Sequence, residues 1–210
     1  DDMLDIARLE SGTLRTDITE FPVAEAFEHI ERQFAPLATR RGLRLRVTRP
    51  ALRVRSDRVL LRRILQNLVS NALRYTQRGG VLVTCRRRGT HVELQVWDTG
   101  PGIPEQHQRA IFDEFRRLDR PSPWGEQGLG LGLSICHRIA LLLGHGLGVR
   151  SEVGRGSVFG IRVPLSQAPA SSTPRATSGA TAGGRPTRSC STGSPPSWWR
   201  GGGASRRSTA

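Results

Sequence analysis

Apolar residues in the first 165 positions recur with two different periods that alternate along the chain. Val23, Phe27 and Ile30 are three and four residues apart, which predicts a helix with one buried face. Leu43, Leu45 and Val47 alternate with arginines, which predicts a half-buried strand. We therefore expect helices over about 21–41, 57–75 and 131–143, and strands over about 43–47, 81–85, 92–97, 147–151 and 157–163. This order predicts an α/β fold, a two-layer sandwich of a mixed β-sheet and α-helices.

The pattern changes at both ends of this region. Residues 1–12 carry apolar residues at helical spacing and stop at Gly12, as the end of a longer helix does. Residues 166–210 are rich in Ser, Gly, Pro, Thr, Ala and Arg, contain no Asp or Glu, and show no apolar periodicity. Such a segment cannot bury enough apolar surface to offset its ordering entropy. We expect three parts: 1–20, a folded domain over 21–165, and a disordered tail over 166–210.

Composition excludes several function classes. The three cysteines are too few and too scattered for a disulfide framework or a zinc site. No apolar run approaches the roughly 20 residues that cross a bilayer, and the acidic start does not resemble a signal peptide. The net charge of +14 comes from arginines that mostly alternate with acids. Because no helix-turn-helix or aromatic stacking platform accompanies this charge, we expect no nucleic-acid partner. Because the sequence shows neither a membrane-spanning run nor a signal peptide, we expect a cytoplasmic location.

Two asparagines mark the predicted helix 57–75. Asn67 and Asn71 are four residues apart, so both amides lie on one helix face. Neutral amide oxygens can coordinate Mg2+ while triphosphate oxygens complete its shell. Without the other motifs, we would favour the interpretation that the two asparagines merely cap the helix or face water.

A turn-rich segment, Asp98-Thr99-Gly100-Pro101-Gly102-Ile103-Pro104, follows the predicted strand 92–97. By composition alone it is an ordinary turn, since Asp, Gly and Pro all favour turns. Its position one hairpin after the asparagine helix makes it a candidate binding loop.

Two further segments follow. Phe112 and Phe115 lie in Ile-Phe-Asp-Glu-Phe, and alone they would be core residues of a short helix. Gly128, Gly130 and Gly132 precede the last predicted helix. A glycine loop that leads into a helix N-terminus presents backbone N–H groups to phosphate. The loop is neither a Walker loop nor a Rossmann fingerprint.

Taken together, and in this order, the four segments resemble the ATP-binding catalytic domain of the histidine kinases. The resemblance implies the superfamily fold shared with the gyrase, heat-shock chaperone and mismatch-repair ATPases, and it implies ATP and Mg2+ as cofactors. It makes Asn67 the metal ligand and catalytic residue, places the phosphates beside Asn71 and Arg74, and gives the adenine to Tyr75 and Asp98. The backbone passes close to the base at Gly100 and Gly102. The phenylalanines anchor a lid over 116–127, and the glycine loop faces the phosphates. Gly154-Arg155-Gly156-Ser157 resembles the family's last glycine motif, although a plain β-turn explains it almost as well.

The same resemblance implies partners that lie outside this chain. Residues 1–20 look like the end of a dimerisation and phosphoacceptor hairpin, yet none of the five histidines has the sequence context of an acceptor. We expect a histidine upstream of this fragment to receive the γ-phosphoryl, a response-regulator receiver domain to act next, and a homodimer only with the full hairpin. A parent protein anchored in a membrane upstream is compatible with this. The alternative is a non-catalytic ATP-binding or interaction module.

The residue at position 63 bears on the reaction type, and the composition of residues 166–210 bears on the origin of the tail. Superfamily members that hydrolyse ATP carry a glutamate base four residues before the metal asparagine, and Arg63 stands there. Arginine cannot take a proton from water at neutral pH, so phosphotransfer fits better than fast hydrolysis. The relatives with this start and ending look like hybrid kinases, in which a receiver follows. We therefore hypothesise that the acid-free tail is a frameshifted receiver start or a non-functional extension.

Overall fold

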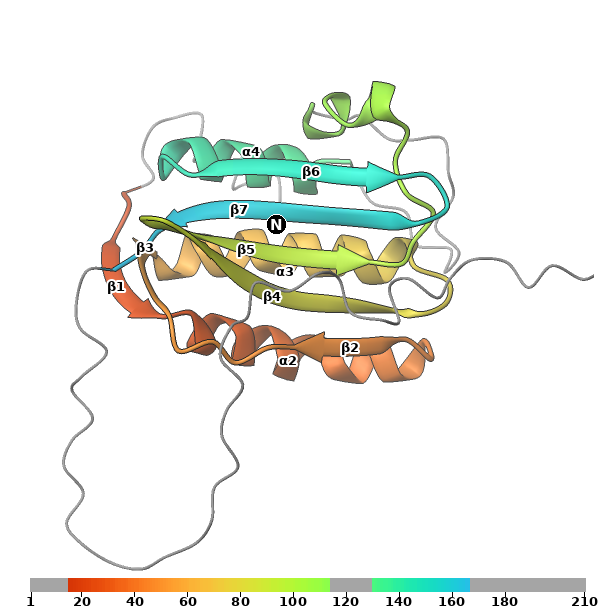
Figure 1. Ribbon diagram of the computed structural model, residues 1–210, viewed down its shortest axis with the longest axis horizontal. Helices are drawn as coiled ribbons and strands as arrows, with labels where there is room; N and C mark the ends of the chain where they lie inside the picture. Colours follow the sequence, from red (N-terminus) through yellow and green to blue (C-terminus); the bar gives the residue numbers. More distant parts are fainter. Residues whose placement is uncertain (1–14, 114–129, 167–210) are drawn as a thin grey trace, which may run out of the picture.

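The computed structural model describes residues 15–113 and 130–166. Its main sheet has five strands in the order β2-β4-β5-β7-β6, in which β2 pairs with β4 in parallel and the other pairs are antiparallel. Three long helices cover one face of this sheet and lie behind it in Figure 1. The predicted two-layer α/β sandwich with a mixed sheet is confirmed. In chain order the elements are β1 (Ile18–Pro22), α2 (Val23–Arg40), β2 (Arg44–Val47), β3 (Arg53–Asp57), α3 (Arg58–Tyr75), β4 (Gly80–Arg88), β5 (His91–Asp98), the 3-10 turns η1 (Glu105–His107) and η2 (Ala110–Phe112), α4 (Gly132–Leu142), β6 (Gly146–Glu152) and β7 (Gly156–Pro164).

Every helix and strand predicted within the described residues is present, with ends that differ by a few positions. The start of α3 shows why the sequence specifies it so well. Asp57 is the N-cap, and its carboxylate accepts hydrogen bonds from the backbone N–H groups of Val59 and Leu60, both at 2.9 Å. Leu61, Ile64, Leu65 and Leu68 then bury one face of the helix in the core.

A second, two-stranded sheet was not predicted. β1 and β3 pair antiparallel, with Phe21 opposite Val54. Leu165 forms an isolated bridge to Val54, and the Ser166 hydroxyl donates to a Glu20 carboxylate oxygen at 2.7 Å. This small sheet therefore joins the first and last described segments of the domain.

The core lies between the main sheet and the helices. Side chains of β4, β5 and β7 alternate, and one set faces the helices: Val83, Val96 and Phe159 are in register across the three strands and are buried. At one end of the same three strands, Asp98 lies opposite Val81 of β4 and opposite Ser157 of β7. An acid thus occupies an inward position at the edge of the core.

Candidate functional site

The asparagine face of α3 meets the beginning of α4. A Cβ built on Gly132, the first residue of α4, would lie 2.8 Å from Oδ1 of Asn67 and 4.0 Å from Nδ2 of Asn71. Both asparagines are only partly buried. Two segments that are about sixty residues apart in the sequence therefore come together, and a side chain at position 132 would displace the Asn67 amide.

The N-terminus of α4 is suited to an anion. Leu131 is its N-cap and, among the described residues, gives it no side-chain cap hydrogen bond. Gly130 directly precedes this cap with φ 75°. The N–H groups of a first helical turn have no partner within the helix, so they are available to phosphate oxygens beside Asn67 and Asn71.

Asp98 is the last residue of β5, and it is 6% exposed. The backbone N–H of Gly100 donates to its Oδ1 at 2.8 Å. Burial raises the pKa of Asp98 to about 7, against a smaller lowering by backbone hydrogen bonds from Gly100 and Ser157. A buried carboxylate is a strong acceptor for an N–H donor that replaces the lost water.

The loop after Asp98 touches the end of α3. A Cβ on Gly100 would lie 2.7 Å from Asp98 Oδ1, 3.5 Å from the Tyr75 carbonyl oxygen and 3.6 Å from Thr76 Oγ1. Thr76 is buried, and its hydroxyl donates to the Ala72 carbonyl at 2.6 Å. Tyr75 is 40% exposed and Arg74 is partly buried. The predicted adenine residues Tyr75, Asp98 and Gly100 thus lie at one end of α3.

Two glycines of the predicted motifs make close approaches to backbone. Gly102 has φ 72°, and a Cβ there would lie 2.1 Å from the carbonyl oxygen of Glu152 at the end of β6. Gly156 has φ 102°, and a Cβ there would lie 2.0 Å from the Asp98 carbonyl oxygen. Both positions require glycine for packing of the loop against the β6–β7 hairpin. A structural reason therefore stands beside the role that the resemblance implies for Gly102.

Phe112 lies in η2 and packs against α4. Its ring centroid is 5.6 Å from that of His137, and the side chain contacts the core. Phe115, Gly128 and the predicted lid 116–127 lie outside the described residues. In the described part of this segment, the turn η2 lies against α4.

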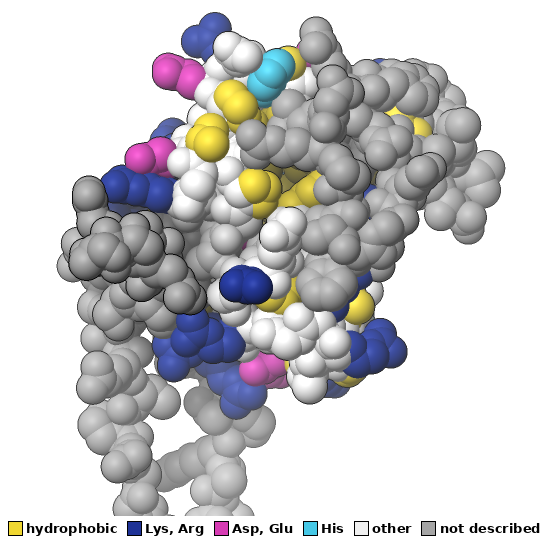
Figure 2. Space-filling view, turned by 90° about the vertical axis from the view of Figure 1, so that its right-hand side faces the viewer, with side chains coloured by type: hydrophobic (Ala, Val, Ile, Leu, Met, Phe, Trp, Pro, Cys, Tyr) yellow, Lys and Arg dark blue, Asp and Glu magenta, His cyan; other side chains and the backbone are white. Residues whose placement is uncertain are grey.

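The strands β5 and β6 and the helix α3 all end on the same side of the molecule, on the right in Figure 1. Figure 2 faces this end and shows apolar side chains and arginines there. A base needs apolar surface and triphosphate needs cations, so this mixture suits a nucleotide.

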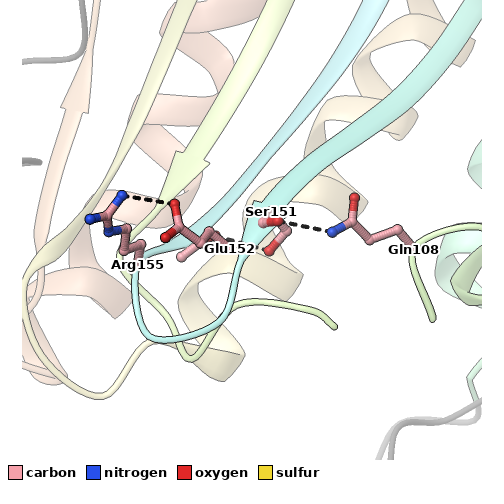
Figure 3. Close-up of polar contacts among 5 residues, drawn as sticks. Gln108, Ser151, Glu152 and Arg155 are labelled. Atoms are coloured by element: carbon pink, nitrogen blue, oxygen red, sulfur yellow. Dashed lines mark hydrogen bonds and ion pairs between the residues drawn. The ribbon is translucent and has the colours of Figure 1, made fainter. Parts of the chain in front are cut away.

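Sequence reasoning missed the contribution of β6 to this site. Ser151 and Gln108 hydrogen-bond the loop that follows Asp98, as Figure 3 shows for their contact with each other. The only sequence signal was the Gly154-Arg155-Gly156-Ser157 motif, which marks the hairpin but not its partner. Gly154 donates its N–H to the Pro101 carbonyl at 2.9 Å, so this turn packs on the loop.

The described residues hold no group of three or more His, Cys, Asp or Glu side chains that could bind a metal by themselves. A site built on Asn67 fits Mg2+ in another way, since Mg2+ usually takes one or two protein oxygens and completes its shell with substrate phosphates and water. Within 15–113 and 130–166, no helix is both long and apolar enough to span a bilayer.

Comparison with known proteins gives consistent results. Residues 56–167 match the family described as histidine kinase-, DNA gyrase B-, and HSP90-like ATPase. The sensor histidine kinase RcsC of Escherichia coli is 34% identical over 78% of this chain, and the autoinducer 2 sensor kinase/phosphatase LuxQ of Vibrio cholerae is 37% identical over 78%. The chain spans only about a fifth of these relatives, 18% and 20% of their lengths.

Solved structures agree in fold. Full-length ShkA in complex with AMPPNP superposes with a TM-score of 0.71 at 29% identity, covering 80% of this chain and 35% of ShkA. The catalytic domain of the histidine kinase ThkA gives a TM-score of 0.61 at 29% identity, covering 71% of this chain and 96% of that domain. Because the family match covers more than half of the sequence, the chain belongs to the histidine kinase-, DNA gyrase B- and HSP90-like ATPase family.

Proposed function

We propose that the domain over 21–165 binds ATP with Mg2+ and transfers the γ-phosphoryl group to a histidine outside this chain. The observation that carries the proposal is that α3 meets both motifs: Asn67 lies against Gly132 at the start of α4, and the loop after Asp98 lies against the end of the same helix. The similarity to sensor histidine kinases supports transfer to histidine over other ATP-dependent reactions.

Each residue has a role that its position supports. The Asp98 carboxylate accepts a hydrogen bond from the exocyclic amine of adenine, and the aromatic ring of Tyr75 lies beside the base. The Asn67 amide oxygen is the metal ligand, while Asn71 and the Arg74 guanidinium face the phosphates. When bound, Mg2+ neutralises charge on the β- and γ-phosphates. Backbone N–H groups at Gly130 and Gly132, with Gly128, complete the phosphate site.

The reaction is a displacement at phosphorus. An imidazole nitrogen of the acceptor forms the new P–N bond, the bond from the γ-phosphorus to the β–γ bridging oxygen breaks, and ADP leaves with that electron pair. The imidazole N–H proton goes to solvent. Arg63 lies one turn before Asn67 on α3, and no carboxylate there activates water, which favours transfer over hydrolysis.

Partners follow from the same proposal. The acceptor hairpin of the full-length kinase supplies the histidine and the homodimer, and a receiver domain of a response regulator takes the phosphoryl group next. One neighbour, ThkA, is solved in complex with the response regulator TrrA, at 26% identity and a TM-score of 0.63. We place the domain in the cytoplasm and propose no nucleic-acid partner.

Phosphotransfer with labelled ATP tests the proposal against the alternative of a non-catalytic module. The chain alone should take up no acid-labile label, and a separately supplied acceptor hairpin should become labelled. Asn67→Ala should abolish this labelling while the fold remains intact, because it removes a ligand and not a packing group. Gln66→Ala is the matched control, because Gln66 is the neighbour of Asn67 on α3 but its amide points to α2, where it donates to Gln33 at 2.6 Å. Nucleotide binding without any transfer would favour the non-catalytic module, and normal transfer by Asn67→Ala would refute the metal assignment.

A further inference from the structure

The segment Thr99–Pro104, here called the adenine loop, is held by the end of β6 and by the β6–β7 turn. The Ile103 N–H donates to Ser151 Oγ at 2.8 Å, and the Gly154 N–H donates to the Pro101 carbonyl at 2.9 Å. Neither Ser151 nor Gly154 belongs to the residues expected to face the nucleotide. The loop therefore depends on a hairpin about fifty residues later in the sequence.

Ser151 uses the full bonding capacity of its hydroxyl. It donates to the Gly156 carbonyl at 2.9 Å, accepts from Ile103 N–H, and lies 2.8 Å from the Ser157 hydroxyl, which can donate to it. One donor and two acceptor positions are thus all occupied. Because Ser157 also bonds the Asp98 carboxylate through its backbone, the Ser151 hydroxyl links the adenine loop to the strand pair that carries Asp98.

Gln108 makes a second link. Its Nε2 donates to the Ile103 carbonyl at 3.1 Å and to the Ser151 carbonyl at 2.9 Å, so both amide hydrogens are used. Figure 3 shows its side chain reaching toward Ser151, and the Glu152–Arg155 ion pair at the turn beside it. Gln108 lies between η1 and η2, four residues before Phe112. It therefore ties the described segment that leads to Phe112 to both the adenine loop and β6.

We propose that Ser151 and Gln108 are positioning residues that hold the adenine loop in its nucleotide-binding shape before ATP arrives; this rests on the proposed function. A preformed loop loses less conformational freedom on binding than a loop that must be ordered by the ligand. Neither side chain belongs to the residues expected to contact the nucleotide, and both bond the backbone of the loop. Their effect should therefore appear in nucleotide affinity and leave the chemical step at saturation unchanged.

Calorimetric titration of the whole chain with ADP tests the proposal. Ser151→Ala removes the bond to Ile103, and Gln108→Glu keeps the side-chain size but replaces two donors by a carboxylate facing two carbonyls. We expect ADP to bind about five- to thirtyfold more weakly to each variant. Ser151→Thr retains the hydroxyl and should bind within about threefold of the unmodified protein.

Ser56→Ala separates positioning from loss of stability. Ser56 lies on β3, at the end of the domain opposite the adenine loop. It is buried, and its hydroxyl is hydrogen-bonded to His145 Nε2 at 2.8 Å. It should lower the melting temperature about as much as Ser151→Ala and leave ADP affinity unchanged. In the transfer assay, Ser151→Ala should raise KM for ATP with kcat unchanged.

The outcomes distinguish nucleotide binding by the chain from positioning of the loop by Ser151 and Gln108. Failure of the unmodified chain to bind ADP would overturn the proposed function and this inference with it. Normal ADP binding by the unmodified chain together with equal binding by Ser151→Ala and Gln108→Glu would overturn the inference alone. A loss of affinity in Ser56→Ala equal to that in Ser151→Ala would also overturn it, since the effect would then be general destabilisation.

Discussion

Replacing Asp98 by asparagine should stabilise the nucleotide-free protein and weaken nucleotide binding. In the folded protein, burial raises the pKa of this carboxyl from 3.8 to about 7. Above pH 7 the folded protein must therefore hold an ionised carboxylate that favours water. Asparagine keeps an oxygen that can accept the Gly100 N–H bond at 2.8 Å but has no charge to bury.

The magnitude follows from the two pKa values. Between pH 3.8 and about 7 the folded state binds more protons at Asp98 than the unfolded state, so stability falls as the pH rises through this window. At 1.36 kcal/mol per pKa unit, the titration of Asp98 makes the fold less stable than at low pH by about 4 kcal/mol at pH 8, where the folded carboxyl is ionised, and by about 2 kcal/mol at pH 5, where it is still protonated and only the unfolded chain has lost the proton. The excess stability of Asp98→Asn should therefore grow by about 2 to 3 kcal/mol between these pH values.

Urea unfolding at pH 5, 6.5 and 8 without nucleotide measures this difference. Glu105→Gln is the matched control, because it also turns a carboxylate into an amide but at an exposed position in η1. The same Asp98→Asn variant should bind ADP at least about tenfold more weakly at pH 8, through loss of a charge-assisted hydrogen bond. A constant stability difference from pH 5 to pH 8 would refute the burial argument, and unchanged ADP affinity would refute the adenine assignment.

Four other predictions concern separate features. Gly156→Ala should lower the free energy of unfolding by about 3 kcal/mol or more, because its Cβ would meet the Asp98 carbonyl. Gly154→Ala, with open space around it, should lower it by only about 1 kcal/mol, and equal losses in urea unfolding would contradict the contact. Gly132→Ala should displace the Asn67 amide, 2.8 Å from the new Cβ, and so weaken binding of ADP with Mg2+ more than binding of ADP alone in calorimetry; equal weakening would argue against a metal at Asn67. Burial lowers the pKa of His145, so its contribution to stability is complete above pH 6.5 and is lost as the pH falls through the folded pKa; His145→Gln should flatten the thermal stability profile below pH 6.5, and an unchanged profile would exclude His145 as the source. Truncation after Ser166 should leave ADP affinity and melting temperature unchanged, and a lower melting temperature would show that the tail is part of the fold.

The sequence predicted the elements whose signals are local. α3 carries its own cap at Asp57 and its own apolar face, and β4 and β5 are joined by a short turn at Gly89, so each could be recognised within a few residues. β1 and β3 could not, because their pairing joins residues 31 to 39 positions apart. Nor could the burial of Ser56, which depends on its contact with His145. The same distinction holds within the site.

For the site, the motifs on α3, after β5 and before α4 were predicted, and the structure brings their described residues together. The supports of the adenine loop were not predicted, because Ser151 and Gln108 belong to no motif and act only through partners that are distant in sequence. Gly102 was predicted to lie near the base and Gly156 to belong to a glycine motif or a plain turn, and the close contacts of both with backbone could be known only from the packing of the β6–β7 hairpin.

The small β1–β3 sheet has a mechanical consequence. It brings the beginning of the domain, at Glu20, within a hydrogen bond of its end, at Ser166. Both lie on the left in Figure 1, opposite the end where β5 terminates. Chain segments that continue from these two positions leave the domain at adjacent points, so a rotation about the line through those points moves the far end along the longest arc. A small rotation about the segment around Glu20 and Ser166 would therefore produce a larger displacement of the end that carries Asp98.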